Sequence, residues 1–177
     1  MYDIIGDIHG HSEELLLLLG KLGYCYQGGA YRHPDRIALF LGDYIDRGPD
    51  SLRCLEIVKA MVDEGSAVAL MGNHEYNAIC FHQQDKTGGH LRPHLIKNVL
   101  QHETTLKSFK RNQELYEAYI NWFRSLPMYF ENDQFRAVHA CWEPKSLAVI
   151  NERLSDGALT EALAVESADK KTELYDA

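Results

Sequence analysis

The 177-residue sequence lacks a basic excess, a long apolar run and a closely spaced pair of cysteines. It carries 18 Lys and Arg against 26 Asp and Glu, giving a formal net charge of −8. General affinity for nucleic acid needs a basic surface, so no nucleic-acid partner is expected. The leucine run at 15–19 is far shorter than the roughly 20 apolar residues of a membrane-spanning helix, so no membrane partner is expected either.

The cysteines and the N-terminus favour a cytoplasmic protein. Cys25, Cys54, Cys80 and Cys141 are far apart and form no Cys-x-x-Cys motif, which predicts reduced thiols. The N-terminus has neither a basic segment nor a cleavage signature, so we expect no signal peptide. Length and a hydrophobic content of 45% suit one domain over residues 1–177, and the oligomeric state is left open.

Three short apolar segments are present, and each runs directly into a polar cluster flanked by glycine. The segments are 2–5, 36–41 and 67–71. The polar residues Asp7, Asp43 and Asn73 are 36 and 30 positions apart, the length of one strand–helix–strand unit. The order β-α-β-α-β predicts a parallel α/β sheet, and ligands bind beyond the carboxyl ends of such strands. We therefore expect the three clusters to lie on one rim.

Two helices are predicted between these strands. The first begins at Ser12 as its N-cap and stops at Gly23, with one apolar face against the sheet. The four residues of that face are Leu15, Leu18, Leu19 and Leu22. Pro49 opens the second helix and Gly65 ends it.

The second half of the chain is less regular. Residues 83–113 are polar, and we expect an inserted loop with short helices that caps the rim. Apolar residues recur at helical spacing over 116–123, which predicts a helix there. A hairpin with a tight turn is predicted at Asn132-Asp133. Residues 144–177 are expected to be helical, with frayed final residues.

The polar clusters contain a set of metal ligands. Asp7 and His9 are two apart in an extended segment, so both side chains can hold one cation. Asp43 has two carboxylate oxygens and can bridge two cations, while Asn73 offers an amide oxygen and His139 an imidazole nitrogen. Mixed oxygen and nitrogen ligands suit Mn, Fe or Zn better than Ca. Two such ions can acidify a shared water toward a pKa of about 7, which makes a nucleophile.

Three further residues suit phosphate chemistry. The planar guanidinium of Arg47 fits phosphate oxygens. His74, next to Asn73, can protonate a leaving group, and Asp46 can orient His74 through a ring nitrogen. The negative net charge does not oppose this prediction, because bound dications can reverse the local field.

In these residues the chain resembles the calcineurin-like metallophosphoesterases. The resemblance is to the serine/threonine phosphoprotein phosphatase branch, with its bacterial members and diadenosine tetraphosphatases. Segments matching the first three family signatures are Gly6-Asp7-Ile8-His9-Gly10, Gly42-Asp43-Tyr44-Ile45-Asp46-Arg47-Gly48 and Gly72-Asn73-His74-Glu75. Val138-His139-Ala140 resembles the fourth.

The resemblance implies a layered β-sheet sandwich flanked by helices and a dinuclear phosphoesterase site. Asp7, His9 and Asp43 would hold one metal, and Asp43, Asn73 and His139 would contribute to the other. Arg47 would contact phosphate, and His74 with Asp46 would form the acid pair. The implied substrate is a phosphorylated small molecule, such as a nucleotide polyphosphate, or a phosphoprotein.

The chain departs from the family pattern at two places. Cys141-Trp142 follows the fourth-signature His, where the family usually has a small glycine-rich turn. The family also supplies one more metal-binding His near its C-terminal end, and no His follows His139 here. We therefore expect a fold that is incomplete at its C-terminus and a weaker second metal site.

Other interpretations of these residues remain open. His139 could be a core histidine rather than a ligand. His90, His94 and His102 could be extra ligands, but we expect solvated loop residues, and Cys141 is expected to be a buried thiol. His11, His33 and His82 are expected not to bind metal. The alternative function is a catalytically weak phosphate-binding or regulatory module that retains the metal motifs.

Overall fold

The computed structural model describes residues 1–154 and 157–177, and its core is a three-stranded parallel sheet. The sheet order is β1 (Tyr2–Ile5), β4 (Ile37–Phe40) and β5 (Ala67–Ala69). The register pairs Tyr2 with Ile37 and Ala38 with Ala67, so all three strands end at the same edge. The predicted α/β fold with a parallel sheet is thus confirmed.

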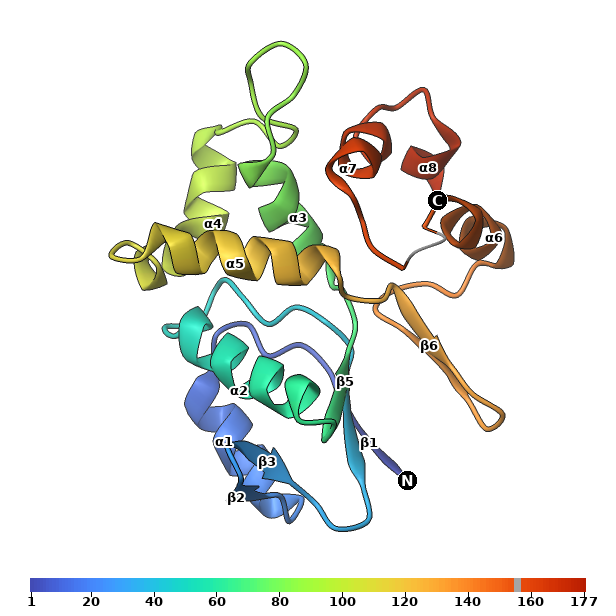
Figure 1. Cartoon of the computed structure of the whole chain (residues 1–177). Helices are drawn as coiled ribbons and strands as arrows, with labels where there is room; N and C mark the ends of the chain where they lie inside the picture. The colour runs from blue at the N-terminus through green and yellow to red at the C-terminus, as the bar shows by residue number, and fades with distance from the viewer. Residues whose placement is uncertain (155–156) are drawn as a thin grey trace.

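Helices α1 (Ser12–Lys21) and α2 (Ser51–Asp63) connect these strands and lie on the same side of the sheet (Figure 1). Both were predicted, with small errors at their starts. Ser12 is the first helical residue rather than the cap, and α2 is capped by Asp50, whose side chain accepts from the backbone of Arg53. Of the leucine stripe, Leu15 and Leu19 are buried and Leu22 is half-buried, whereas Leu18 is 39% exposed.

A small hairpin between α1 and β4 was not predicted. Its strands are β2 (Cys25–Gln27) and β3 (Ala30–Arg32). Gly28 and Gly29 join them with φ values of 63° and 94°, in the left-handed region that glycine adopts without strain. The Gly-Gly pair was the available sequence signal for this turn.

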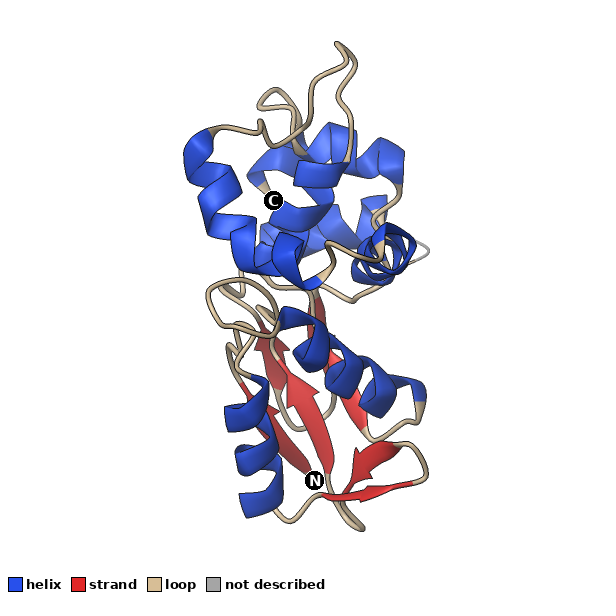
Figure 2. Cartoon of the chain, turned by 90° about the vertical axis from the view of Figure 1, so that its left-hand side faces the viewer, coloured by secondary structure: helices blue, strands red, loops and turns tan. Residues whose placement is uncertain are grey.

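A layer of helices covers the carboxyl ends of the strands (Figure 2). It contains α3 (Asn73–His82), α4 (Ile96–Ser108) and α5 (Gln113–Arg124). The predicted stripe of α5 is buried in full, as Tyr116, Tyr119, Ile120 and Phe123. Within 83–113 the expected short helices are instead one helix of 13 residues, α4.

The hairpin predicted before His139 is present as β6 (Tyr129–Glu131) and β7 (Arg136–Val138). Its turn is wider than predicted, because the side chain of Asn132 accepts from the backbone of Gln134 and Phe135. Phe130 and Phe135 pack on Tyr2 of β1 with ring centroids 5.2 and 5.4 Å away. This contact brings the end of β7 beside the parallel sheet.

The C-terminal part forms three helices, α6 (Pro144–Arg153), α7 (Glu161–Ser167) and α8 (Glu173–Asp176). The expectation of frayed final residues was wrong, because Leu174 of α8 is buried. Tyr76 of α3 and Ser167 of α7 share a hydrogen bond of 2.9 Å between their hydroxyls, which links this part to the helical layer. None of the described helices is long and apolar enough to cross a membrane.

Candidate metal centre

The loops that leave β1 and β4 hold four non-glycine residues in the left-handed region. Their φ values are 46° for His9, 57° for Asp43, 69° for Asp46 and 62° for Arg47. Each such residue costs roughly 1–3 kcal/mol, and strain of this kind concentrates at functional sites. Backbone hydrogen bonds hold the loops together, including those from His9 N to Asp43 O (2.9 Å) and from Gly48 N to His9 O (2.8 Å).

Gly48 allows these two loops to touch. A Cβ atom there would lie 2.2 Å from the carbonyl oxygen of His9 and 2.7 Å from the carbonyl carbon of Gly10. Both contacts are to backbone, so neither neighbour can turn away. The close approach fixes the β1 loop, which carries Asp7 and His9, against the β4 loop.

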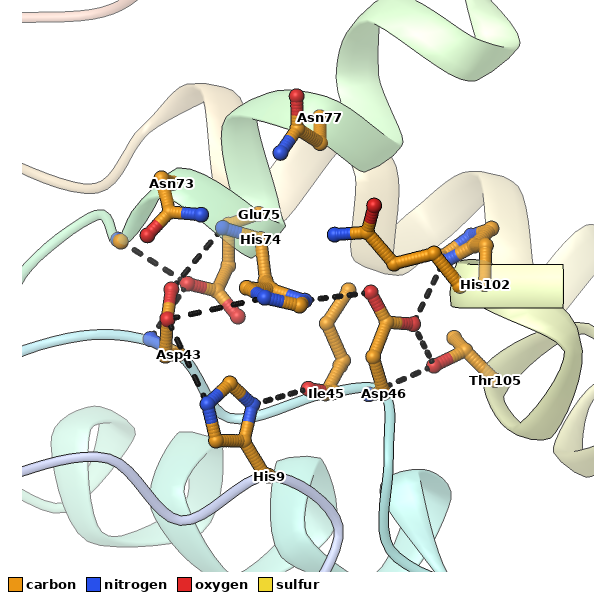
Figure 3. A network of polar contacts seen from close by, with 12 residues as sticks. His9, Asp43, Ile45, Asp46, Asn73, His74, Glu75, Asn77, His102 and Thr105 are labelled. Carbon is orange, nitrogen blue, oxygen red and sulfur yellow. Dashed lines mark hydrogen bonds and ion pairs between the residues drawn. The ribbon is translucent and has the colours of Figure 1, made fainter. Parts of the chain in front are cut away.

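His9 presents an unpartnered nitrogen to two carboxylates, and Figure 3 shows the one that belongs to Asp43. Its Nδ1 lies 3.0 Å from the carbonyl oxygen of Ile45, which assigns the ring proton to Nδ1 and leaves a lone pair on Nε2. That Nε2 lies 3.6 Å from Asp7 Oδ2 and 3.6 Å from Asp43 Oδ2. Among the described residues it is a buried atom without a hydrogen bond, and a cation would satisfy it.

His139 and Asn73 repeat this arrangement on the other side of Asp43. His139 Nδ1 donates to the carbonyl oxygen of Leu41 at 2.9 Å, which leaves its Nε2 as an acceptor. Nε2 nevertheless faces Asn73 Oδ1 at 2.9 Å and Asp43 Oδ1 at 3.5 Å. Three acceptors that face one another fit a shared cation.

Asp43 lies at the centre, with one oxygen toward His9 and the other toward His139. The nearly buried carboxylate also accepts from the backbone N–H of His74 through Oδ1 at 2.9 Å. Glu75 fixes the loop after β4, because its carboxylate accepts hydrogen bonds from the backbone N–H groups of Asp43, Tyr44 and Gly72. Burial and the nearby charge of Asp43 raise the pKa of Glu75 to about 7, despite these hydrogen bonds.

The two residues predicted to form the acid pair are in contact, His74 from the start of α3 and Asp46 from the loop after β4. His74 Nδ1 lies 2.6 Å from Asp46 Oδ2, and both side chains are buried. Burial disfavours charge on each group, but hydrogen bonds outweigh it. The hydrogen bond to Asp46 and the charge of Asp43 raise the pKa of His74, and hydrogen bonds from His102 and then His74 lower the pKa of Asp46.

His74 also has a second possible role. His9, Asp43 and His74 each offer a ligand atom within 4.8 Å of the others, and His74 Nε2 lies 3.9 Å from Asp43 Oδ2. Because Nδ1 of His74 is occupied by Asp46, Nε2 is the atom free to face either a cation or a substrate. Figure 3 shows this ring between the two aspartates.

Two sequence expectations about nearby residues were wrong. His102, expected in a solvated loop, is 5% exposed, and its Nδ1 lies 2.6 Å from Asp46 Oδ1. Cys141, expected to be buried, is exposed. Arg47 is also exposed, at the strained loop beside Asp46.

The sequence did not predict the contacts that Glu75, His102 and Thr105 make within the candidate site. The position of Glu75 in the first turn of α3 was an available signal, because a helix N-terminus attracts such a side chain. No local signal marked His102 or Thr105, since both meet Asp46 across 56 and 59 residues of chain.

Comparison with known proteins places this chain in a protein family. The sequence model described as Calcineurin-like phosphoesterase matches residues 2–150. A cold-active protein-tyrosine phosphatase of a psychrophilic Shewanella species superposes with a TM-score of 0.62. It is 22% identical, and the match covers 96% of this chain and 52% of that one, so the likeness concerns the fold.

The most similar sequences include asymmetrical bis(5'-nucleosyl)-tetraphosphatases named PrpE. The protein from Oceanobacillus iheyensis is 36% identical over 128 residues, 72% of this chain and 50% of that protein. One from Bacillus cereus is 38% identical over 140 residues, 77% of this chain and 55% of that protein. One from Halalkalibacterium halodurans is 50% identical over 74 residues, 41% and 30% of the two chains. The chain thus spans about half or less of the length of these curated relatives.

Proposed function

This chain belongs to the calcineurin-like phosphoesterase family, and we propose that it hydrolyses phosphoric esters or anhydrides at the site around Asp43. One observation carries the proposal. The oxygens of Asp43 face two imidazole nitrogens, on His9 and His139, that have lone pairs and no hydrogen-bond donor opposite them. A site of this composition is suited to two divalent cations.

We assign the ligands in two sets that share Asp43. Asp7, His9 and Asp43 would hold the first ion, and Asp43, Asn73 and His139 the second. Manganese is the ion we expect, with iron or zinc as the other ions that such ligands accept. When bound, the two ions would activate water for attack on phosphorus and neutralise the phosphate charge.

The chain's own residues would do the rest of the work. His74 would give a proton from Nε2 to the leaving oxygen, since Nδ1 is held by Asp46. Asp46, ionised and buried, would orient the ring and stabilise its charged form. The exposed guanidinium of Arg47 would bind phosphate oxygens in its planar fork.

The substrate class we favour is a nucleotide polyphosphate, with a phosphoprotein as the second class. The names of the PrpE relatives support the first, because a tetraphosphate contains the anhydride bonds that this chemistry would cleave. We further propose that residues 1–177 act as one domain capped by 83–113. A cytoplasmic location is supported by four cysteines that are all free.

A substrate panel tests the function. Metal-free protein would be supplied with Mn²⁺ and assayed on a dinucleoside tetraphosphate, a phosphopeptide and an aryl phosphate. We expect turnover that requires the metal and is fastest on the tetraphosphate. If phosphate and metal bind but no substrate turns over, the phosphate-binding module is the correct alternative. That alternative draws support from the second ligand set, which shares its one carboxylate with the first.

A further inference from the structure

The carboxylate of Asp46 is held from two sides by different elements. Its Oδ2 faces His74 of α3. Its Oδ1 accepts from His102 Nδ1 at 2.6 Å and from Thr105 Oγ1 at 2.7 Å, both on α4 (Figure 3). Helix α4 therefore supplies two hydrogen-bond donors to Asp46, the residue that would orient His74.

We propose that His102 is a positioning residue that acts through Asp46 to fix the ring of His74. The proposal rests on the proposed function, in which His74 is the proton donor. Helix α4 would then do more than cover the strand ends. It carries no metal ligand in our assignment, but two of its residues contact Asp46 of the acid pair.

The hydrogen bonds around His102 identify it as an orienting group. Its Nε2 faces the hydroxyl of Tyr116 on α5. Burial and the charge of Asp46 raise the pKa of Tyr116, so the hydroxyl stays protonated and can donate to Nε2. The tautomer that fits both partners carries a proton on Nδ1 of His102 and donates it to Asp46. Each nitrogen of the ring is therefore engaged in a hydrogen bond.

Because Asp46 is buried, the loss of its hydrogen bond with His102 should affect the site. Asp46 is 1% exposed, so water cannot replace a donor that is removed. With His102 and Thr105 fixing Oδ1, the carboxylate cannot rotate, and Oδ2 stays opposite His74 Nδ1. Without His102, Asp46 keeps its charge but loses the donor that defines the plane of the carboxylate.

Three variants test the role of His102. His102→Leu removes the donor, while His102→Asn keeps an N–H near the position of Nδ1. His90→Leu is the matched control, because His90 lies in the same segment and stacks on His94 instead. On a substrate with a poor leaving group, we expect His102→Leu to lower kcat about 10- to 100-fold with little change in KM, since a misplacement of about 1 Å can cost that much. His102→Asn should recover most of this loss, and His90→Leu should resemble the wild type.

A double variant separates positioning from general damage. If His102 acts through His74, then adding His102→Leu to His74→Asn should lower kcat no further. Independent, multiplying losses in the double variant would overturn the proposal, as would an unchanged kcat in His102→Leu.

The proposal also has a test that needs neither metal nor turnover. In the metal-free protein, NMR should show a protected, downfield Nδ1 proton of His74, assigned by its absence in His74→Asn. We expect this signal in the wild type and in His102→Asn, and its loss through rapid exchange in His102→Leu. A signal that persists unchanged in His102→Leu refutes the positioning role. A wild type without turnover would instead refute the proposed function alone, because this NMR result does not depend on it.

Discussion

At the scale of single residues, Asp43 is the side chain on which both ligand sets depend. We expect Asp43→Asn to lose at least one equivalent of metal and nearly all turnover, because an amide offers one oxygen in place of two. The fold should be kept, since the amide oxygen can still accept from the backbone of His74. Elemental analysis and thermal unfolding of the metal-free protein check the two parts. Two tightly held metals in this variant would exclude the bridging role.

His74 is predicted to serve in proton transfer rather than in metal binding. His74→Asn should lower kcat by about 10²–10⁴-fold on a substrate with a poor leaving group, the usual contribution of a general acid. A substrate whose leaving group needs no proton should be affected much less, and metal content should stay the same. Equal losses on both substrates would argue against the acid role. A loss of bound metal would identify His74 as a ligand, the role that its distance to Asp43 also permits.

The sequence alone was sufficient to predict that the polar residues at the strand ends lie close together. Asp7, Asp43 and Asn73 could be placed because parallel strands present their carboxyl ends at one edge, whatever the details of packing. Residues that reach the site from a later helix could not be placed this way. His102 was expected to be solvated because its polar surroundings in sequence do not reveal that α4 turns it toward Asp46.

At the scale of elements, the contact between the β1 and β4 loops depends on Gly48. Gly48→Ala should destabilise the fold by about 1–3 kcal/mol, the usual cost of inserting a methyl group into a packed site. Metal affinity should fall with it, because His9 and Asp43 lie on the two loops that are forced apart. Denaturant unfolding and metal titration measure the two effects.

Gly20→Ala is the control for this substitution. A Cβ atom at this helical position meets nothing within 4 Å. The free energy of unfolding of this variant should therefore rise by about 0.5–1 kcal/mol, and its metal affinity should be unchanged. A Gly48→Ala protein as stable as the wild type would contradict the close approach of the two loops.

Helix α4 is joined to the α2 side of the site by Thr105. Its hydroxyl donates to Asp46 Oδ1, accepts from the backbone of Asp46 at 3.0 Å and lies 3.0 Å from Ser51 Oγ. Thr105→Val should cost about 1–3 kcal/mol in the free energy of unfolding, because buried partners lose their hydrogen bonds. The neighbouring Thr104→Val should change stability by less than about 0.5 kcal/mol.

Thr104 suits this comparison because its buried hydroxyl has no partner among the described residues. If Thr105→Val and Thr104→Val lower the free energy of unfolding equally, then α4 is held by packing rather than by its hydrogen bonds to Asp46.

Helices with a periodic apolar stripe were predicted well. Turns whose shape depends on particular side chains or glycines were not. The apolar stripe of α5 was sufficient to predict that helix. The β6–β7 turn is wider than expected because Asn132 forms its own hydrogen bonds, and the β2–β3 turn depends on two glycines. Tertiary contacts decided the rest, including the helix of 13 residues within 83–113.

At the scale of the whole molecule, the two metal sites should differ in affinity. The first set contains two carboxylates and an imidazole, and the second contains one shared carboxylate, an amide and an imidazole. Fewer charged ligands give a weaker site, so the second ion should leave first during dilution or mild chelation. The family's additional His has no counterpart after His139 in these 177 residues.

The most direct test of the Asp43-centred site is a titration of metal-free protein with Mn²⁺. Bound metal per chain and turnover of an aryl phosphate would be followed in the same preparation. We expect one equivalent to bind tightly with little activity, and turnover to rise as a second, weaker equivalent binds. Two equivalents of equal, tight affinity would contradict the unequal sites. Turnover that is complete at zero or one equivalent would contradict the dinuclear site itself.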